Sequence, residues 1–232
     1  MKVLLIIPAY NEEECILNTV NEIKKSKLNI DYIVINDGST DNTETILREN
    51  NINHIELINN LGIGGAVQTG YKYAYQNNYD IAVQFDADGQ HDINSLETII
   101  NPIIQDKYDM VIGSRFIKKT DGFRSSSSRR FGIKLISFFI KLFTGKRIYD
   151  VTSGFRAVNK KIIANFAKSY PVEFPEPVTN TEIIKRNYKF KEVSVIMKER
   201  AGGVSSIKSW KSAYFMINVI LSIFIVSIRR YK

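Results

Sequence analysis

The chain has 232 residues, of which 44% are apolar and 24% are charged. These values exclude an intrinsically disordered protein and indicate one large globular domain, or a domain with an appendage. The single cysteine, Cys15, excludes an internal disulfide and fits a reducing cytoplasm. With only two histidines besides, the composition also argues against a structural zinc site.

Positive charge is concentrated in the second half of the chain, and the net charge is +8. Residues 115–147 and 198–232 each contain one acidic residue, Asp121 and Glu199. Such a balance is typical of contact with nucleic acid or with an anionic membrane surface. Large apolar residues alternate with the charges and no nucleic-acid-binding signature is present, so we expect a membrane surface and no nucleic acid.

Strand-like and helix-like segments alternate along the first half of the chain. We expect strands over residues 3–7, 32–35, 54–58, 81–85 and 110–112. We expect four helices in this half. The first opens at the acidic run 12–14, the second follows residue 41 and ends near Asn50, the third spans 66–76 and the fourth lies near 95–105. This alternation predicts an α/β fold, a mostly parallel sheet with helices on both faces. No signal peptide precedes the first strand, so we expect the protein to stay inside the cell.

Two apolar segments in the second half, residues 131–143 and 213–228, lie among basic residues. In the first, the aromatic and leucine side chains are expected near one helical face and the lysines on the opposite one: Phe131, Leu135, Phe138, Phe139 and Leu142, against Lys134 and Lys141. A core helix and a helix lying flat in lipid headgroups both fit this pattern. The second is just below the length of a membrane span, so we expect it in the membrane interface or in an oligomer contact.

The strand expected at residues 81–85 ends in an acidic turn, Asp86-Ala87-Asp88-Gly89-Gln90. Ligands bind beyond the carboxyl ends of parallel strands, so Asp86 and Asp88 should face a cleft. Two carboxylates with an amide suit Mg²⁺ or Mn²⁺, and such an ion would hold a diphosphate. An ordinary acidic turn is the alternative, because Asp and Gly are common turn residues.

Two further strand ends carry polar or glycine-rich turns. Asp37 could accept hydrogen bonds from a nucleobase or ribose, although helix capping by Ser39 or Asp41 would explain this turn as well. The glycines of residues 60–66 would let the backbone approach a nucleoside closely. A plain turn is the alternative for this loop.

Five motifs occur in an order that resembles the family 2 glycosyltransferases. They are residues 7–13 (IPAYNEE), 36–41 (NDGSTD), 60–66 (NLGIGGA), 86–91 (DADGQH) and 113–116 (GSRF). Within that family the chain is similar to the branch of dolichol-phosphate mannose synthase and its bacterial relatives. The resemblance implies a GT-A (Rossmann-like) fold, a nucleotide-diphosphate sugar donor and inversion at the anomeric carbon. It also implies donor-side residues, namely Pro8, Tyr10, Glu12 and Asp37 at the nucleoside, Gly64 and Gly65 beside the base, Ala87 at the diphosphate, and Asp86, Asp88 and Gln90 at the metal.

The resemblance also implies residues on the acceptor side. Arg115, one of Arg129 or Arg130, and Arg200 match positions near an acceptor phosphate, which the arginine fork binds through two oxygens. A solvated or headgroup-facing pair is the alternative for Arg129 and Arg130. Asp150 belongs to a motif over residues 150–156 (DVTSGFR) that lines this side.

A general base is needed only for one class of acceptor. If the acceptor is a sugar hydroxyl, Glu176 or Glu182 is a candidate base. If the acceptor is a phosphate, its oxygen is already anionic and needs no base. We expect residues 1–116 to form the donor half, 117–207 the acceptor half with an interface helix, and 208–232 a C-terminal helix.

We therefore expect a metal-dependent, inverting glycosyltransferase that associates peripherally with the inner face of the cell membrane. It would move a sugar from a nucleotide-diphosphate donor, which we expect to be a UDP-sugar, to polyprenyl phosphate or a lipid-linked glycan. Its product would serve surface polysaccharide or glycolipid synthesis, and the C-terminal helix could also form a homo-oligomer. A nucleotidyltransferase is disfavoured because residues 8–11 lack a glycine- and arginine-rich loop. A non-catalytic sugar-nucleotide-binding protein is disfavoured because Asp86, Asp88 and Gln90 are all present.

Overall fold

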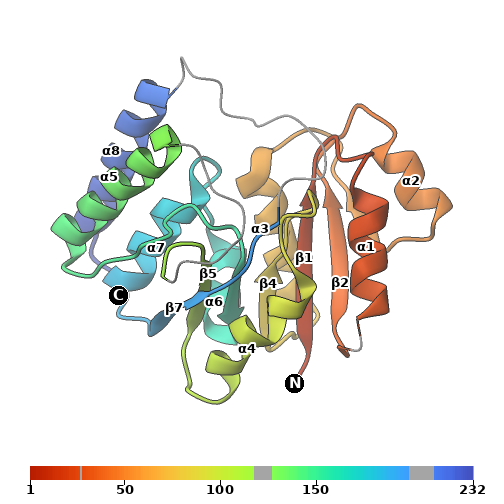
Figure 1. The fold of residues 1–232 in the computed structure, drawn as a ribbon, viewed down its shortest axis with the longest axis horizontal. Helices are drawn as coiled ribbons and strands as arrows, with labels where there is room; N and C mark the ends of the chain where they lie inside the picture. Colours follow the sequence, from red (N-terminus) through yellow and green to blue (C-terminus); the bar gives the residue numbers. More distant parts are fainter. Residues whose placement is uncertain (27, 118–126, 199–211, 232) are drawn as a thin grey trace.

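One seven-stranded mixed sheet organises the computed structural model, which describes residues 1–26, 28–117, 127–198 and 212–231 (Figure 1). The strand order is β3-β2-β1-β4-β6-β5-β7. The strands are β1 (Val3–Ala9), β2 (Asp31–Asn36), β3 (His54–Glu56), β4 (Ile81–Gln84), β5 (Met110–Ser114), β6 (Arg156–Asn159) and β7 (Phe190–Ser194).

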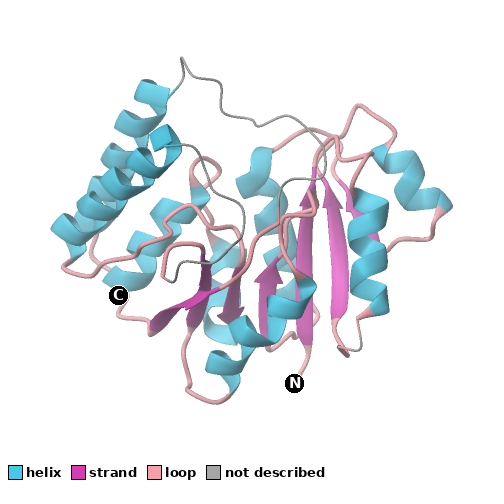
Figure 2. Ribbon diagram, in the orientation of Figure 1, coloured by secondary structure: helices cyan, strands magenta, loops and turns pink. Residues whose placement is uncertain are grey.

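Helices follow most of the strands and cover both faces of the sheet (Figure 2). The helices of the described residues are α1 (Ile16–Lys25), α2 (Thr43–Glu49), α3 (Gly62–Gln76), the 3₁₀ turn η1 (Ile93–Ser95), α4 (Leu96–Ile104), α5 (Ser127–Thr144), α6 (Lys160–Lys168), α7 (Pro175–Lys185) and α8 (Ser212–Ile228).

Strand β6 is antiparallel to both of its neighbours, β4 and β5, whereas the other neighbouring strands pair in parallel. The carboxyl ends of the six parallel strands therefore meet at one edge of the sheet, where β6 begins. In this register Arg156, the first residue of β6, lies directly opposite Gln84 of β4 and Ile112 of β5. A cationic side chain is thereby placed in the sheet beside the acidic turn that follows β4.

The sheet separates two hydrophobic cores, and β1 contributes to both. Leu4 and Ile6 pack into the core formed with α3 and α6, while Leu5 and Ile7 pack into the core formed with α1 and α4. Successive side chains of a strand point to opposite faces. This is why the continuous apolar run at the start of the chain forms a fully buried strand.

The predicted α/β architecture and its five strands are confirmed, but β6, β7, α6 and α7 were not predicted. Strand β6 has the sequence RAVN and contains a buried arginine, so it has no apolar run. Strand β7, FKEVS, lies at the edge of the sheet and is half-buried along its length, which explains its charged residues.

The prediction for α5 is corrected in one respect. The side opposite the phenylalanines is not occupied by lysines, because Ile133, Ile136 and Ile140 pack there against the core while Lys134 and Lys141 are exposed. At 3.6 residues per turn, the two lysines fall at the border of the aromatic face and not across the helix from it. Helix α5 thus has a buried isoleucine side and an exposed aromatic side.

Helices α5 and α8 lie side by side at one end of the molecule (Figure 1). Their outward faces carry exposed apolar side chains, which together we call the α5–α8 surface: Phe131, Phe138 and Leu142 on α5, and Ile217, Leu221, Phe224, Ile225 and Ile228 on α8. Ring contacts join the two helices, since Phe143 of α5 lies 5.4 Å from Phe224, centroid to centroid. Across the described ranges, none of the helices has the length and apolarity that a membrane crossing requires.

Candidate active site

The acidic turn after β4 is held in place by His91. The backbone N–H of Asp86 donates to His91 Nδ1 at 2.9 Å, so this nitrogen is unprotonated and the ring proton of a neutral His91 lies on Nε2. That Nε2 is 3.5 Å from Asp86 Oδ2. The imidazole stacks on Phe155 at 4.6 Å between ring centroids and 18° between planes. His91 therefore fixes the backbone of Asp86 and faces its carboxylate, a role that the sequence pattern did not predict.

Contacts from two other segments, and one bond within the turn, hold the rest of it. Thr19 of α1 donates to the carbonyl oxygen of Ala87 at 2.8 Å. The N–H of Gln90 donates to Asp88 Oδ1 at 3.0 Å, and the N–H of Lys198 donates to the Gln90 carbonyl at 2.9 Å. Asp88 is buried, whereas one third of the Asp86 side chain is exposed. The turn is thus a fixed part of the fold, in which Asp86 is the more accessible of the two carboxylates.

The space next to Asp86 depends on Gly154. A Cβ atom at this position would lie 2.9 Å from Asp86 Oδ2 and 2.8 Å from Gln84 Nε2, closer than a Cβ atom comes to other atoms in proteins. Within the described residues, His, Cys, Asp and Glu form no group of three that could hold a metal ion. Mg²⁺ commonly binds through one or two carboxylates together with substrate phosphates. The pair Asp86 and Asp88, with the amide of Gln90, is a donor set that fits such an ion.

The nucleoside-side motifs predicted from the sequence meet around Asp37. Its backbone N–H donates to the Ala9 carbonyl at the end of β1, and its Oδ1 accepts from the N–H of Leu61 at 2.8 Å. Burial raises the pKa of Asp37, and the N–H groups of Leu61 and Gly62 partly offset that rise. The end of β1, the loop after β2 and the loop after β3 therefore meet at one residue, Asp37.

The other predicted nucleoside contacts lie in the same region. Pro8 is part of β1, the Tyr10 side chain is exposed just beyond it, and the N–H of Glu12 donates to Thr43 Oγ1 at 2.9 Å. Gly64 has a packing role, because a Cβ there would lie 2.1 Å from the Pro171 carbonyl oxygen. A Cβ on Gly65 would likewise lie too close to a neighbour, 2.4 Å from the Cβ of Leu61. Packing explains both glycines, and contact of either one with a nucleobase stays a prediction.

A buried ion pair lies behind Asp86. Arg156 is fully buried, and its guanidinium is 3.3 Å from Glu176 Oε1 and donates to Thr179 Oγ1 at 2.7 Å. Burial raises the pKa of Glu176, and the charge of Arg156 offsets this only in part. Burial also opposes the charge of Arg156, but the attraction of Tyr170 and Glu176 leaves its pKa above the usual value. Glu176 therefore acts first as the partner of Arg156.

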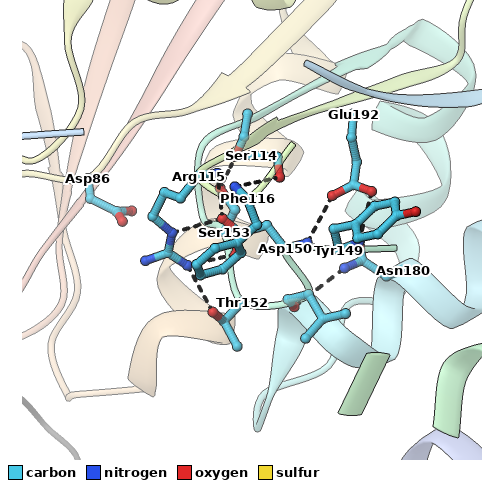
Figure 3. Close-up of polar contacts among 12 residues, drawn as sticks. Asp86, Ser114, Arg115, Phe116, Tyr149, Asp150, Thr152, Ser153, Asn180 and Glu192 are labelled. Carbon is cyan, nitrogen blue, oxygen red and sulfur yellow. Dashed lines mark hydrogen bonds and ion pairs between the residues drawn. The ribbon is translucent and has the colours of Figure 1, made fainter. Parts of the chain in front are cut away.

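Arg115, at the end of β5, is held by Asp150 (Figure 3). Asp150 Oδ2 accepts from the backbone N–H and from Nε of Arg115, at 3.0 and 2.8 Å, and Oδ1 accepts from an Nη at 2.6 Å. The Asp150 side chain has no exposed area, and that of Arg115 is 10% exposed. Burial opposes the charge of Arg115, but the hydrogen bonds and charge of Asp150 leave its pKa raised. Asp86 lies beside the guanidinium and also attracts it.

The remaining predicted residues are Glu182, two arginines of α5, and Arg200. Glu182 accepts from Arg186 Nε at 2.6 Å and from Asn165 at 3.0 Å, so it joins α7 to α6. Arg129 and Arg130 lie in the first turn of α5 and are exposed. Arg200 lies outside the described residues.

Comparison with known proteins decides the family. The model of "Glycosyl transferase family 2" matches residues 4–166. The chain is a family 2 glycosyltransferase. It is 36% identical over 205 residues to the UDP-N-acetylglucosamine--dolichyl-phosphate N-acetylglucosaminyltransferase of Methanococcus voltae, with 81% of each chain covered. This confirms the resemblance to the branch that contains dolichol-phosphate mannose synthase.

Two further similarities place this glycosyltransferase among its relatives. It is 30% identical over 162 residues to the undecaprenyl-phosphate mannosyltransferase of Micrococcus luteus, covering 68% of this chain and 66% of the relative. Its fold matches glucosyl-3-phosphoglycerate synthase from Mycobacterium tuberculosis, solved with Mn²⁺ and UDP, with a TM-score of 0.72 and 15% identity, over 100% of this chain and 81% of the other. At that identity the match shows the fold alone.

Proposed function

We propose that this glycosyltransferase moves a sugar from a UDP-sugar to the phosphate of a polyprenyl phosphate. The two candidate general bases are each paired with an arginine: Glu176 with Arg156, and Glu182 with Arg186. Both glutamates therefore make structural contacts within the fold, and neither stands free to take a proton from a sugar hydroxyl. A phosphate acceptor needs no base, so the pairing favours polyprenyl phosphate over a sugar hydroxyl.

The named relatives support both substrates. The relative from Methanococcus voltae is described as using UDP-N-acetylglucosamine and dolichyl phosphate, and the one from Micrococcus luteus as using undecaprenyl phosphate. In the proposed reaction an acceptor phosphate oxygen forms a bond to the anomeric carbon of the sugar, on the side opposite the departing UDP. The bond from that carbon to the UDP oxygen breaks, UDP leaves, and the configuration at the carbon inverts.

Different residues of this chain would bind the donor and the acceptor. Asp37 and Tyr10 would bind the nucleoside, while Arg115 would bind the acceptor phosphate beside the donor site. Asp86, Asp88 and Gln90 would hold Mg²⁺ or Mn²⁺. When bound, the metal ion supplies positive charge to the departing diphosphate.

Replacement of Asp88 by asparagine tests the metal assignment. Asparagine keeps an oxygen that can accept from the N–H of Gln90, so the melting temperature should stay within about 3 °C of wild type. Turnover at saturating UDP-sugar should fall by roughly 100-fold or more, because a charged ligand is lost. Asp106→Asn, which changes an exposed carboxylate paired with Lys191, is the matched control and should keep full turnover. Wild-type turnover in Asp88→Asn would overturn the assignment.

We also propose that the α5–α8 surface docks on an anionic membrane, which is where a polyprenyl phosphate resides. The surface combines exposed aromatic and aliphatic side chains with the flanking cations Lys134 and Lys141. Arg229 and Arg230 follow directly after α8. Apolar side chains beside lysine and arginine are the composition of helices that lie in a headgroup layer.

A further inference from the structure

The contact between Arg115 and Asp150 depends on a turn that strand β7 holds from the far side. The backbone N–H of Tyr149 donates to Glu192 Oε2, and the N–H of Asp150 donates to Glu192 Oε1, both at 2.8 Å (Figure 3). One carboxylate therefore binds two consecutive amide groups. Hydrogen bonds to a charged acceptor are roughly twice as strong as those between neutral groups.

Glu192 is itself fixed by the sheet. It pairs in register with Ile112 of β5, which lies three residues before Arg115. Its carboxylate also takes a hydrogen bond from the hydroxyl of Ser114, which is fully buried. Burial raises the pKa of Glu192, while the two amides lower it. The side chain thus spans from β7, past the end of β5, to the turn before Asp150.

Asp150 connects Glu192 to the guanidinium of Arg115. All of its carboxylate contacts described above go to Arg115, and its backbone N–H goes to Glu192. Arg115 gains one further bond, from Nη2 to Thr152 Oγ1 at 3.0 Å, on the same turn. The position of the arginine fork is therefore set by residues 149–152 and not by its own strand alone.

We propose that Glu192 is a positioning residue for the acceptor phosphate. It fixes residues 149–150, and through them the guanidinium of Arg115. The inference rests on the proposed function, in which Arg115 binds the acceptor phosphate. Glu192 does not itself touch a substrate. Its loss should weaken acceptor binding and leave donor binding unchanged.

Glu192→Gln is the sharpest test because it keeps the size of the side chain. The amide nitrogen of glutamine cannot accept a hydrogen bond, so one of the two backbone N–H groups loses its partner. The KM for polyprenyl phosphate should rise about tenfold, while kcat and the KM for UDP-sugar stay within about twofold. Glu44→Gln is the matched control, because Glu44 is an exposed glutamate paired with Arg48 on α2.

A double-mutant cycle shows whether Glu192 acts through Asp150. Asp150→Asn removes the charge that holds Arg115 and should raise the acceptor KM at least as much. The double variant Glu192→Gln/Asp150→Asn should resemble Asp150→Asn alone, since residues that act in series are not additive. Multiplied effects on the acceptor KM would show that Glu192 acts by another route and would overturn the proposal.

A measurement without substrate keeps the two proposals separate. In an NMR spectrum of the full chain with labelled arginine, the Nε–H of Arg115 should be protected from exchange in wild type. We expect that protection to fall at least about tenfold in Glu192→Gln and to remain in Glu44→Gln. Unchanged protection in Glu192→Gln would overturn the positioning role. Absence of transfer by wild type would overturn the proposed function, and the NMR comparison would still decide the role of Glu192.

Discussion

At the scale of single residues, the polar groups around the site come in matched pairs, and Asn36 is an example. Asn36 is fully buried at the end of β2. Its Nδ2 donates to Glu56 Oε2 at 2.8 Å, and its Oδ1 accepts from the hydroxyl of Ser39. An aspartate here would put an oxygen next to the carboxylate of Glu56. The amide therefore goes together with the glutamate on the neighbouring strand.

Asn36→Asp should lower the free energy of unfolding at pH 7 by roughly 1–3 kcal/mol, since a hydrogen bond is replaced by repulsion between carboxylates. Thermal unfolding followed by circular dichroism would measure it. The double variant Asn36→Asp/Glu56→Gln reverses donor and acceptor and should recover most of the loss. A single variant as stable as wild type would contradict this reading of the pair.

Gly154 is a second residue whose effect is predicted to be local. In Gly154→Ala the new Cβ would push against the ends of Asp86 and Gln84, and those flexible groups can move at little cost in stability. Moving the Asp86 carboxylate should nevertheless lower kcat by roughly 10- to 100-fold. Gly132→Ala is the control, because a Cβ there would contact Met216 at an ordinary 3.7 Å. Equal activity of the two variants would contradict the predicted crowding.

At the scale of elements, the sequence predicts strands that are continuous apolar runs. It does not predict contacts between side chains that are far apart along the chain. The apolar runs of β1, β2, β4 and β5 predicted these strands. The motifs predicted that Asp37 and the acidic turn follow the ends of strands. The partners of Arg156 and Asp150 could not be predicted, because they depend on the register of β6 and β7. Helix α7 was also missed, because its buried face includes Thr179, Asn180 and Thr181.

The α5–α8 surface gives a prediction at the same scale. Phe138→Asp/Leu221→Asp places two charges on side chains that are 55% and 51% exposed, so folding should be unchanged. Sedimentation with vesicles containing anionic lipid should show a loss of bound protein, because charge opposes insertion among the headgroups. Tyr75→Asp changes an equally exposed aromatic residue on α3 and should bind like wild type. Unchanged binding of the double variant would instead favour an oligomer contact at this surface.

At the scale of the whole molecule, the proposed function would give the two substrates separate approaches, one at the sheet edge and one at the α5–α8 surface. Helices α1 and α2 lie at one end of the molecule, with α5 and α8 at the other (Figure 1). The predicted nucleoside residues follow β1 and β2, while Arg115 follows β5, nearer to α7 and α8. A lipid-linked phosphate held at the α5–α8 end would therefore meet the donor at Asp86, between the two.

The most direct measurement is transfer from a panel of UDP-sugars to polyprenyl phosphate, compared with the unphosphorylated polyprenol and with products identified by mass spectrometry. We predict a sugar attached through the phosphate, formed with Mg²⁺ or Mn²⁺ and lost with a chelator. We predict no product from the polyprenol. Its hydroxyl proton would need a base, and both candidate bases, Glu176 and Glu182, are paired with arginines. Transfer to the polyprenol, or transfer that persists in the chelator, would contradict the account.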